Sequence, residues 1–254
     1  MLDLQKASML KRISAFILDV ILLAVAITGF AFFLSAVTGF DSYNERLNEI
    51  EASYASEYGF ENLQKTQEEF EALAPEEQER YKLAADAYSK DAEANRAYGM
   101  IVNLTLVITS ISILLGYLLL EFTVPLIFKN GQTLGKKIFG IALMRNDGVK
   151  INTVMLFVRT VLGKYTIETM VPVLVIIMTF FGSAGIIGLA VLLLIVILEI
   201  VMLCTTKTRS CIHDVLAYTV AVDMQSQMIF GSVEELLEYK KKLHAEVVAD
   251  SDYK

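Results

Sequence analysis

Long apolar runs that contain single acidic residues restrict the fold of this chain more than any other feature. Residues 13–37 form an apolar run in which Asp19 is the only ionisable side chain, and residues 100–128 form a second run whose only charged side chain is Glu121. A helix needs about 20 residues to cross the ~30 Å hydrocarbon core of a bilayer. Both runs are therefore predicted to span a membrane.

The apolar region 169–204 is too long for one crossing, because its 36 residues would extend ~54 Å as a single helix. A glycine-rich turn at 182–185 divides it into a third span, predicted at 164–181, and a fourth at 186–204, which carries Glu199. With 55% hydrophobic and 20% charged residues, the composition fits such a multispanning protein. The expected fold class is an all-α membrane protein with a four-helix transmembrane bundle.

The distribution of charge predicts the orientation. Lysine and arginine gather in the connector 129–164, whereas the segment 41–98 holds 15 acidic and six basic residues. Since basic residues near the ends of spans stay on the cytoplasmic side, the connector and both termini are expected in the cytoplasm of a bacterial cell, with the protein in the plasma membrane. The net charge of -7 does not suit nucleic-acid binding.

Three parts lie outside the predicted bundle. The segment 41–98 is expected to be an extracytoplasmic helical insertion, either a spacer or a partner-binding cap, because Pro75 and the two acids after it form a helix-start signal. In the connector, the turn 146–148 predicts a β-hairpin, and residues 217–223 could add a third strand. Residues 224–254 are either a helix, beginning at the capping box of Ser232 and Glu235, or a solvated tail.

Helix geometry places three acids at one depth. Arg12 and Asp19, seven residues apart, share a helix face but lie ~10.5 Å apart along the axis, so they cannot pair. Asp19, Glu121 and Glu199 are each predicted about 8–10 Å inside the cytoplasmic boundary. They form either a cation or proton site open to the cytoplasm or a structural cluster paired with basic residues such as Lys136, Lys137 and Arg209.

The remaining polar motifs are weak signals of chemistry. The segment 131–137, with Gly131, Gln132, Thr133, Gly135 and Lys136, is one residue short of a phosphate loop. It is better explained as a tight turn at the membrane exit. His213 and Asp214, which follow Arg209, are too few for catalysis or a metal site, so they are expected to anchor an interfacial turn. Cys204 and Cys211 are expected to be unpaired.

Taken together, these motifs resemble the RDD family of bacterial membrane proteins, named for one arginine and two aspartates. The resemblance rests on Arg12 and Asp19 in "RISAFILD", on "GQTLGKKIFGIAL" before Asp147 and Gly148, and on Asp214 in "HDVLAYTVAV". It covers residues 10–37 and 100–223 as a transmembrane domain and leaves out 41–98 and the tail. It implies a transport role, with sodium/proton exchange proposed for some members.

The expected function is membrane transport coupled to cations or protons through Asp19, Glu121 and Glu199. The alternative is a non-catalytic adaptor or regulator of another membrane protein, which suits a bundle of only four helices. An enzyme is not expected, and no cofactor or metal is expected either. Besides the lipid bilayer, the partners would be further copies of this chain or another membrane protein.

Overall fold

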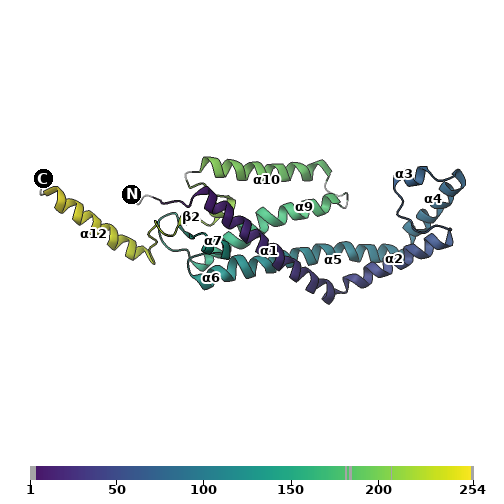
Figure 1. Cartoon of the computed structure of the whole chain (residues 1–254), viewed down its shortest axis with the longest axis horizontal. Helices are drawn as coiled ribbons and strands as arrows, with labels where there is room; N and C mark the ends of the chain where they lie inside the picture. Colours follow the sequence, from purple (N-terminus) through teal and green to yellow (C-terminus); the bar gives the residue numbers. More distant parts are fainter. Residues whose placement is uncertain (1–3, 181, 183–184, 207, 253–254) are drawn as a thin grey trace. The chain divides into compact units, whose positions relative to one another are not determined.

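The computed structural model describes residues 4–180, 182, 185–206 and 208–252, with side chains described to residue 245. It is mainly helical (Figure 1). In chain order its helices and strands are α1 Met9–Thr38, α2 Phe40–Glu57, α3 Gln67–Glu71, α4 Pro75–Lys90, α5 Ala92–Gly116, η1 Tyr117–Thr123, α6 Val124–Phe128, α7 Leu134–Ile138, β1 Ile141–Arg145, α8 Thr153–Phe157, η2 Val158–Met170, α9 Val171–Phe180, α10 Gly185–Thr205, α11 Ile212–Leu216, β2 Thr219–Asp223 and α12 Val233–Asp252. The chain divides into two compact units, Met1–Thr28 with Ile113–Lys254, and Gly29–Ser112.

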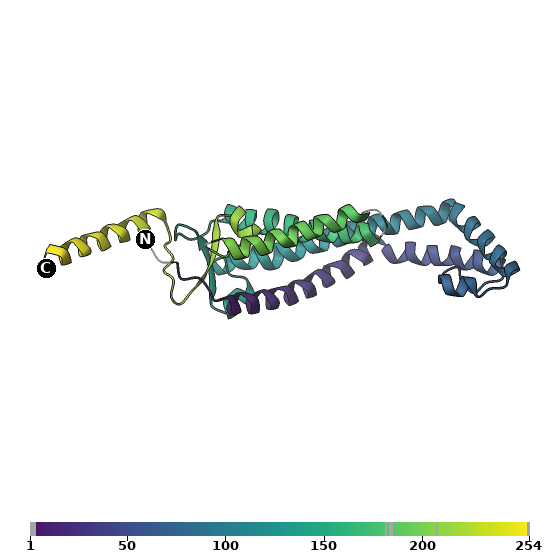
Figure 2. The ribbon, with the colours of Figure 1, turned by 90° about the horizontal axis from the view of Figure 1, so that it is seen from above.

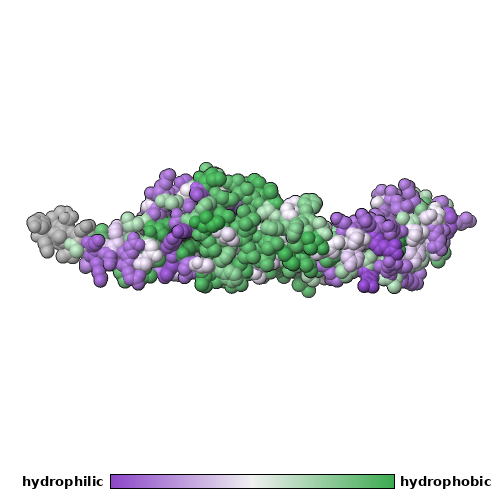
Figure 3. All heavy atoms as spheres, turned by 90° about the horizontal axis from the view of Figure 1, so that it is seen from below, coloured by the Kyte–Doolittle hydropathy of each residue, from purple (hydrophilic) through white to green (hydrophobic). Residues whose placement is uncertain are grey.

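Four stretches of helix among the described residues are long and apolar enough to cross a membrane. They are Met9–Thr38, Ala92–Phe128, Thr153–Phe180 and Gly185–Thr205. They agree with the four spans expected from the sequence, and Figure 3 shows hydrophobic side chains gathered over the middle of the face in view. The last two, which end in α9 and α10, lie side by side (Figures 1 and 2).

The helix that contains the predicted third span extends further toward the N-terminus than that span. This helix starts at Thr153 rather than near Lys164, because the side chain of Asn152 accepts a hydrogen bond from Met155 N at 2.8 Å and caps the first turn. The predicted end at residue 181 and the turn residues 183–184 lie outside the described residues. Gly182 and Gly185, on either side of that turn, both have positive φ.

The small sheet differs from the predicted hairpin. β1 pairs antiparallel with β2, with Ile141 opposite Asp223 and Arg145 opposite Thr219. The residues after the turn 146–148 form no strand in the described part of the chain; they contribute two isolated bridges, Lys150 with Met144 and Val149 with Phe230. The pairing stops there because Asn152 already caps α8. The segment expected as an added third strand is therefore the main partner of β1.

Each part outside the spans has its own packing. In the unit Gly29–Ser112, α2 packs on α4, Ala55 and Ala84 are fully buried, and α4 begins at Pro75 as predicted. In the other unit, Glu235 N donates to Ser232 Oγ at 3.3 Å at the start of α12. Phe230 packs with Val149 and Leu236 and ties this start to the sheet region. Residues 253–254 of the predicted tail lie outside the described residues.

Candidate functional site

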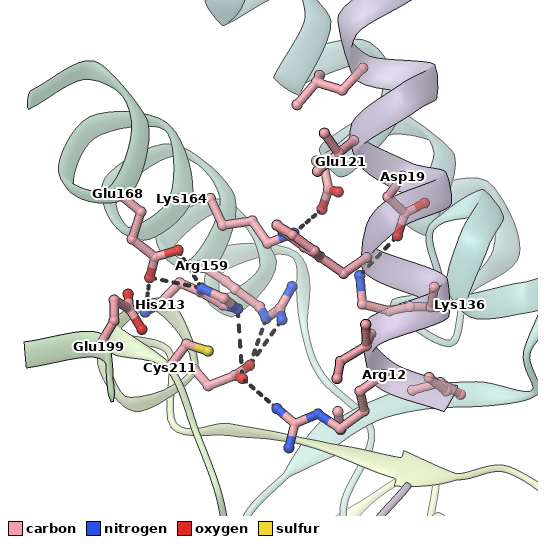
Figure 4. Close-up of a pocket in the computed structure, with 18 of the residues that line it drawn as sticks. Arg12, Asp19, Glu121, Lys136, Arg159, Lys164, Glu168, Glu199, Cys211 and His213 are labelled. Carbon is pink, nitrogen blue, oxygen red and sulfur yellow. Dashed lines mark hydrogen bonds and ion pairs between the residues drawn. The ribbon is translucent and has the colours of Figure 1, made fainter. Parts of the chain in front are cut away.

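A pocket of about 630 Å³ lies among the spanning helices of the unit formed by Met1–Thr28 and Ile113–Lys254 (Figure 4). Its walls come from α1, η1, η2 and α10, and α7 and α11 contribute polar residues. The charged residues that line it are Arg12, Asp19, Glu121, Lys136, Arg159, Lys164, Glu168, Glu199 and Asp214. The three acids predicted to share one depth thus line one pocket.

Asp19 is held by α7. Its carboxylate accepts hydrogen bonds from Thr133 Oγ1 at 2.5 Å and Gly135 N at 2.7 Å, and Lys136 Nζ lies 3.5 Å from Oδ2. Only glycine fits at 135, because a Cβ there would collide with Ala15 O and lie 2.8 Å from Asp19 Oδ1. The predicted tight turn thus brings the backbone of α7 against α1 and gives Asp19 its partners.

Lys136 has both basic and acidic side chains as neighbours. Its Nζ donates to Thr133 Oγ1 at 3.1 Å. Burial, reinforced by the charges of Lys164 and Arg159, lowers the pKa of Lys136 to about 8, although Glu121 and Asp19 act in the opposite direction. The neighbouring Lys137 is exposed and lies 3.7 Å from the centre of the Phe128 ring, so it takes no part in the pocket.

Glu121 has its own partner. Its Oε2 accepts a hydrogen bond from Lys164 Nζ at 2.5 Å, and both side chains are at most 13% exposed. Thr160 Oγ1 donates to the Glu121 carbonyl oxygen at 3.0 Å and joins η2 to η1. Glu121 is therefore a buried ion-pair member.

Asp214 is the centre of a second ion-pair group. Arg159 Nε and Nη2 reach Oδ1 at 3.0 and 2.9 Å, and Thr219 Oγ1 donates to the same oxygen at 3.2 Å. Arg12 Nη2 lies 3.9 Å from Oδ2, while its Nη1 donates to the Arg209 carbonyl oxygen at 2.8 Å. Burial acts to raise the pKa of Asp214, but the charge of Arg159 holds that pKa well below its ordinary value. Arg12 thus meets the second aspartate of the motif rather than Asp19.

Glu199 lies beside a third group, formed by η2 and α11. Glu168 accepts a hydrogen bond from His213 N at 2.8 Å, and its Oε2 lies 2.7 Å from His213 Nδ1. Glu199 lies next to Glu168 and Cys211. The close approach of α11 requires glycine at 163, since a Cβ there would lie 2.5 Å from His213 Cβ.

Burial determines the protonation of Cys211 and His213. It raises the pKa of the Cys211 thiol to about 12, with the acids Asp214, Glu199 and Glu168 acting in the same direction. It also lowers the pKa of His213. Cys204 and Cys211 are both free, as expected.

Three charged residues of the pocket were not among the candidate site residues proposed from the sequence: Arg159, Lys164 and Glu168. They lie five and four residues apart on η2, whose π-helical hydrogen bonds join residues i and i+5. In an α-helix, Arg159 and Lys164 would point about 140° apart. The sequence signal that could have identified them is the presence of three charged residues in an otherwise apolar stretch of helix. The π-helical geometry that brings them to one pocket has no recognisable sequence pattern.

The other predicted polar residues support the turn between α6 and β1. Gly131 and Gln132 are buried, and Gln132 Nε2 donates to the Ile141 carbonyl oxygen at 2.8 Å. Thr133 caps α7 by accepting a hydrogen bond from Lys136 N. The motif thus shapes the backbone that faces Asp19.

Comparison with known proteins gives the family of this chain. Searches of curated proteins and of solved structures return no significant match. A family model, described as the RDD family, matches residues 6–218. That match includes Arg12, Asp19 and Asp214, the arginine and two aspartates that line the pocket. The chain therefore belongs to the RDD family.

Proposed function

We propose that this membrane protein is a cation transporter rather than an enzyme. Asp19 is the carboxylate that binds the cation, and Lys136 releases the proton for which the cation is exchanged. The observation that carries the proposal is the Asp19–Lys136 pair, at 3.5 Å, inside a pocket of the spanning bundle. An uncompensated carboxylate at this depth is unfavourable. A positive charge must therefore occupy the site, and Lys136 supplies it from the chain itself.

The exchange keeps the charge of the site constant. Lys136 Nζ lies near two oxygens, Asp19 Oδ2 and Thr133 Oγ1. When the ammonium group releases its proton to water, a monovalent cation can take its place beside these oxygens. One proton then leaves for each cation that enters, and reprotonation of Lys136 expels the cation.

Burial and five neighbouring groups set the pH at which Lys136 changes charge, and burial has the largest effect. Lys164 and Arg159 disfavour its charged form, Glu121 and Asp19 favour it, and Thr133 accepts its hydrogen bond. With a pKa of about 8, the ammonium group is present below that pH and lost above it. Cation binding at Asp19 is therefore expected to strengthen as the pH rises through this range.

Flux through proteoliposomes tests the proposal. Wild-type protein should exchange Na⁺ or K⁺ for protons, with an about tenfold rise in rate between pH 7 and pH 9 for a lysine of pKa about 8. Asp19→Asn should reduce the rate to that of empty liposomes. Lys136→Gln should remove the pH dependence in this window. Lys137→Gln is the matched control, since Lys137 is exposed beside Phe128, and it should behave as wild type.

The alternative is a non-catalytic adaptor or regulator of another membrane protein. It is favoured by the ion pairs themselves, because Asp19 and Glu121 each have a lysine partner and would then serve only to hold the bundle together. Wild-type protein that exchanges neither Na⁺ nor K⁺ at any pH from 7 to 9 would favour this function over transport.

The orientation belongs to the same proposal: plasma membrane of a bacterial cell, both termini and the pocket mouth cytoplasmic, and the α2–α4 helices extracytoplasmic. Glu76→Cys and Lys240→Cys, each at an exposed position in a Cys204→Ser, Cys211→Ser background, test it. A membrane-impermeant maleimide should label position 76 in intact cells and position 240 only after permeabilisation. The reverse pattern would refute this orientation.

A further inference from the structure

Cys211, His213 and Asp214 bring three kinds of ligand atom together at the pocket, and Figure 4 labels the first two of them. A thiol sulfur, an imidazole nitrogen and a carboxylate oxygen from these residues lie within 4.8 Å of one another. Hard cations such as Mg²⁺ and Ca²⁺ bind oxygen alone, whereas sulfur and imidazole nitrogen are ligands of Zn²⁺ and similar ions. The mixture of atoms therefore points to a zinc-class ion.

The spacing of two of these atoms suits such an ion. In a tetrahedral zinc site with bonds of about 2.0–2.2 Å, a nitrogen and an oxygen ligand lie about 3.3–3.6 Å apart. His213 Nε2 and Asp214 Oδ2 are 3.6 Å apart. Arg12 Nη2 is farther from that oxygen, at 3.9 Å. An ion could bridge the two ligands with little movement of either side chain.

His213 and Asp214 are each held in place through one side-chain atom, and this leaves a second atom of each side chain to bind the ion. His213 Nδ1 faces Glu168 Oε2 at 2.7 Å, which leaves Nε2 directed at Asp214. Histidine ligands of metals characteristically donate their second nitrogen to a carboxylate in this way. Asp214 Oδ1 is held by Arg159 and Thr219, so Oδ2 is the oxygen presented to the ion.

Glu199 is placed to add a fourth ligand. It lines the same pocket as Cys211, His213 and Asp214. Its Oε1 is buried and has no hydrogen-bond partner among the described residues. A divalent ion bound by the Cys211 thiolate and Asp214 is neutral as a group. Arg159 and Arg12, both beside Asp214, carry two positive charges that balance the negative charges of Glu168 and Glu199.

We propose that Cys211 Sγ, His213 Nε2 and Asp214 Oδ2 bind a zinc-class divalent ion, with Glu199 as the fourth ligand and Glu168 as the residue that positions His213. The site rests on these contacts and does not depend on whether the protein exchanges monovalent cations at Asp19.

Co²⁺ binding to the purified full-length protein tests the proposal without any transport assay. Wild type should bind one equivalent and show the near-ultraviolet absorption of a thiolate–cobalt bond. Cys211→Ser should lose that absorption, while Cys204→Ser is the matched control, because Cys204 is exposed on α10, and should keep it. Glu168→Gln should weaken affinity by about 10–100-fold, as expected for a residue that orients a metal-binding histidine.

A second measurement avoids changing any ligand. In the Cys204→Ser protein, Cys211 is the remaining thiol. Zn²⁺ should slow its reaction with a maleimide in detergent, and EDTA should restore the rate. No saturable Co²⁺ binding by wild type, equal binding by Cys211→Ser, or a maleimide rate that Zn²⁺ leaves unchanged would each overturn the site. None of these results would bear on Na⁺ or K⁺ flux, so the two proposals fail separately.

Discussion

Replacing Gly135 with alanine should disrupt the contact between α7 and α1. The added Cβ would lie 2.8 Å from Asp19 Oδ1 and closer still to Ala15 O, whereas ordinary contact begins at 3.4 Å. The backbone of α7 must therefore retreat by at least about 0.6 Å, which stretches the 2.7 Å hydrogen bond from residue 135 N to Asp19 to about 3.3 Å or more. Both overpacking and a weakened bond to a buried carboxylate follow.

The expected loss of stability is the sum of these two effects. Overpacking of a close contact costs about 1–3 kcal/mol, and a hydrogen bond to a charged group contributes about 1.5–3 kcal/mol, part of which is kept. We expect Gly135→Ala to lower the free energy of unfolding by about 2–5 kcal/mol. For a chain of this size that corresponds to a fall in apparent Tm of roughly 5–15 °C.

Thermal unfolding in detergent at a fixed scan rate measures this change. Gly29→Ala in α1 is the matched control, because a Cβ at Gly29 meets no atom within 4 Å and alanine favours a helix. It should unfold at or slightly above the wild-type temperature. If Gly135→Ala unfolds at the wild-type temperature, α7 does not pack against α1 as closely as described.

The Glu121–Lys164 pair gives a further stability prediction. Glu121→Gln leaves the ammonium group of Lys164 buried at 13% exposure without its carboxylate, which is expected to destabilise the protein by about 3–5 kcal/mol. The double variant Glu121→Gln, Lys164→Gln removes both charges and should recover much of the loss; a double variant as unstable as the single one would show that the ion pair is not the reason. The flux, labelling and metal-binding predictions above are independent of both stability measurements.

The sequence by itself determined where the membrane-spanning helices lie. Span length and apolar character are local properties, so residues 13–37, 100–128 and 186–204 fall inside helices of the structure. The depth of Asp19, Glu121 and Glu199 follows from counting residues along those helices, and all three line one pocket. The inability of Arg12 to reach Asp19 also follows from helix geometry alone.

Only the tertiary structure decided which charges meet. Asp19 pairs with Lys136, one of the lysines considered from the sequence, but Glu121 pairs with Lys164 and Glu199 lies beside Glu168. These partners depend on the rotation of each helix about its axis and on the order of the helices around the bundle. The hydropathy of the sequence predicts neither the rotation nor the order. The π-helical geometry of η2 and the pairing of β1 with β2 likewise depend on contacts between distant segments. The ligand atoms of Cys211, His213 and Asp214 come together for the same reason, because Glu168 and Arg159, from another helix, hold two of them in place.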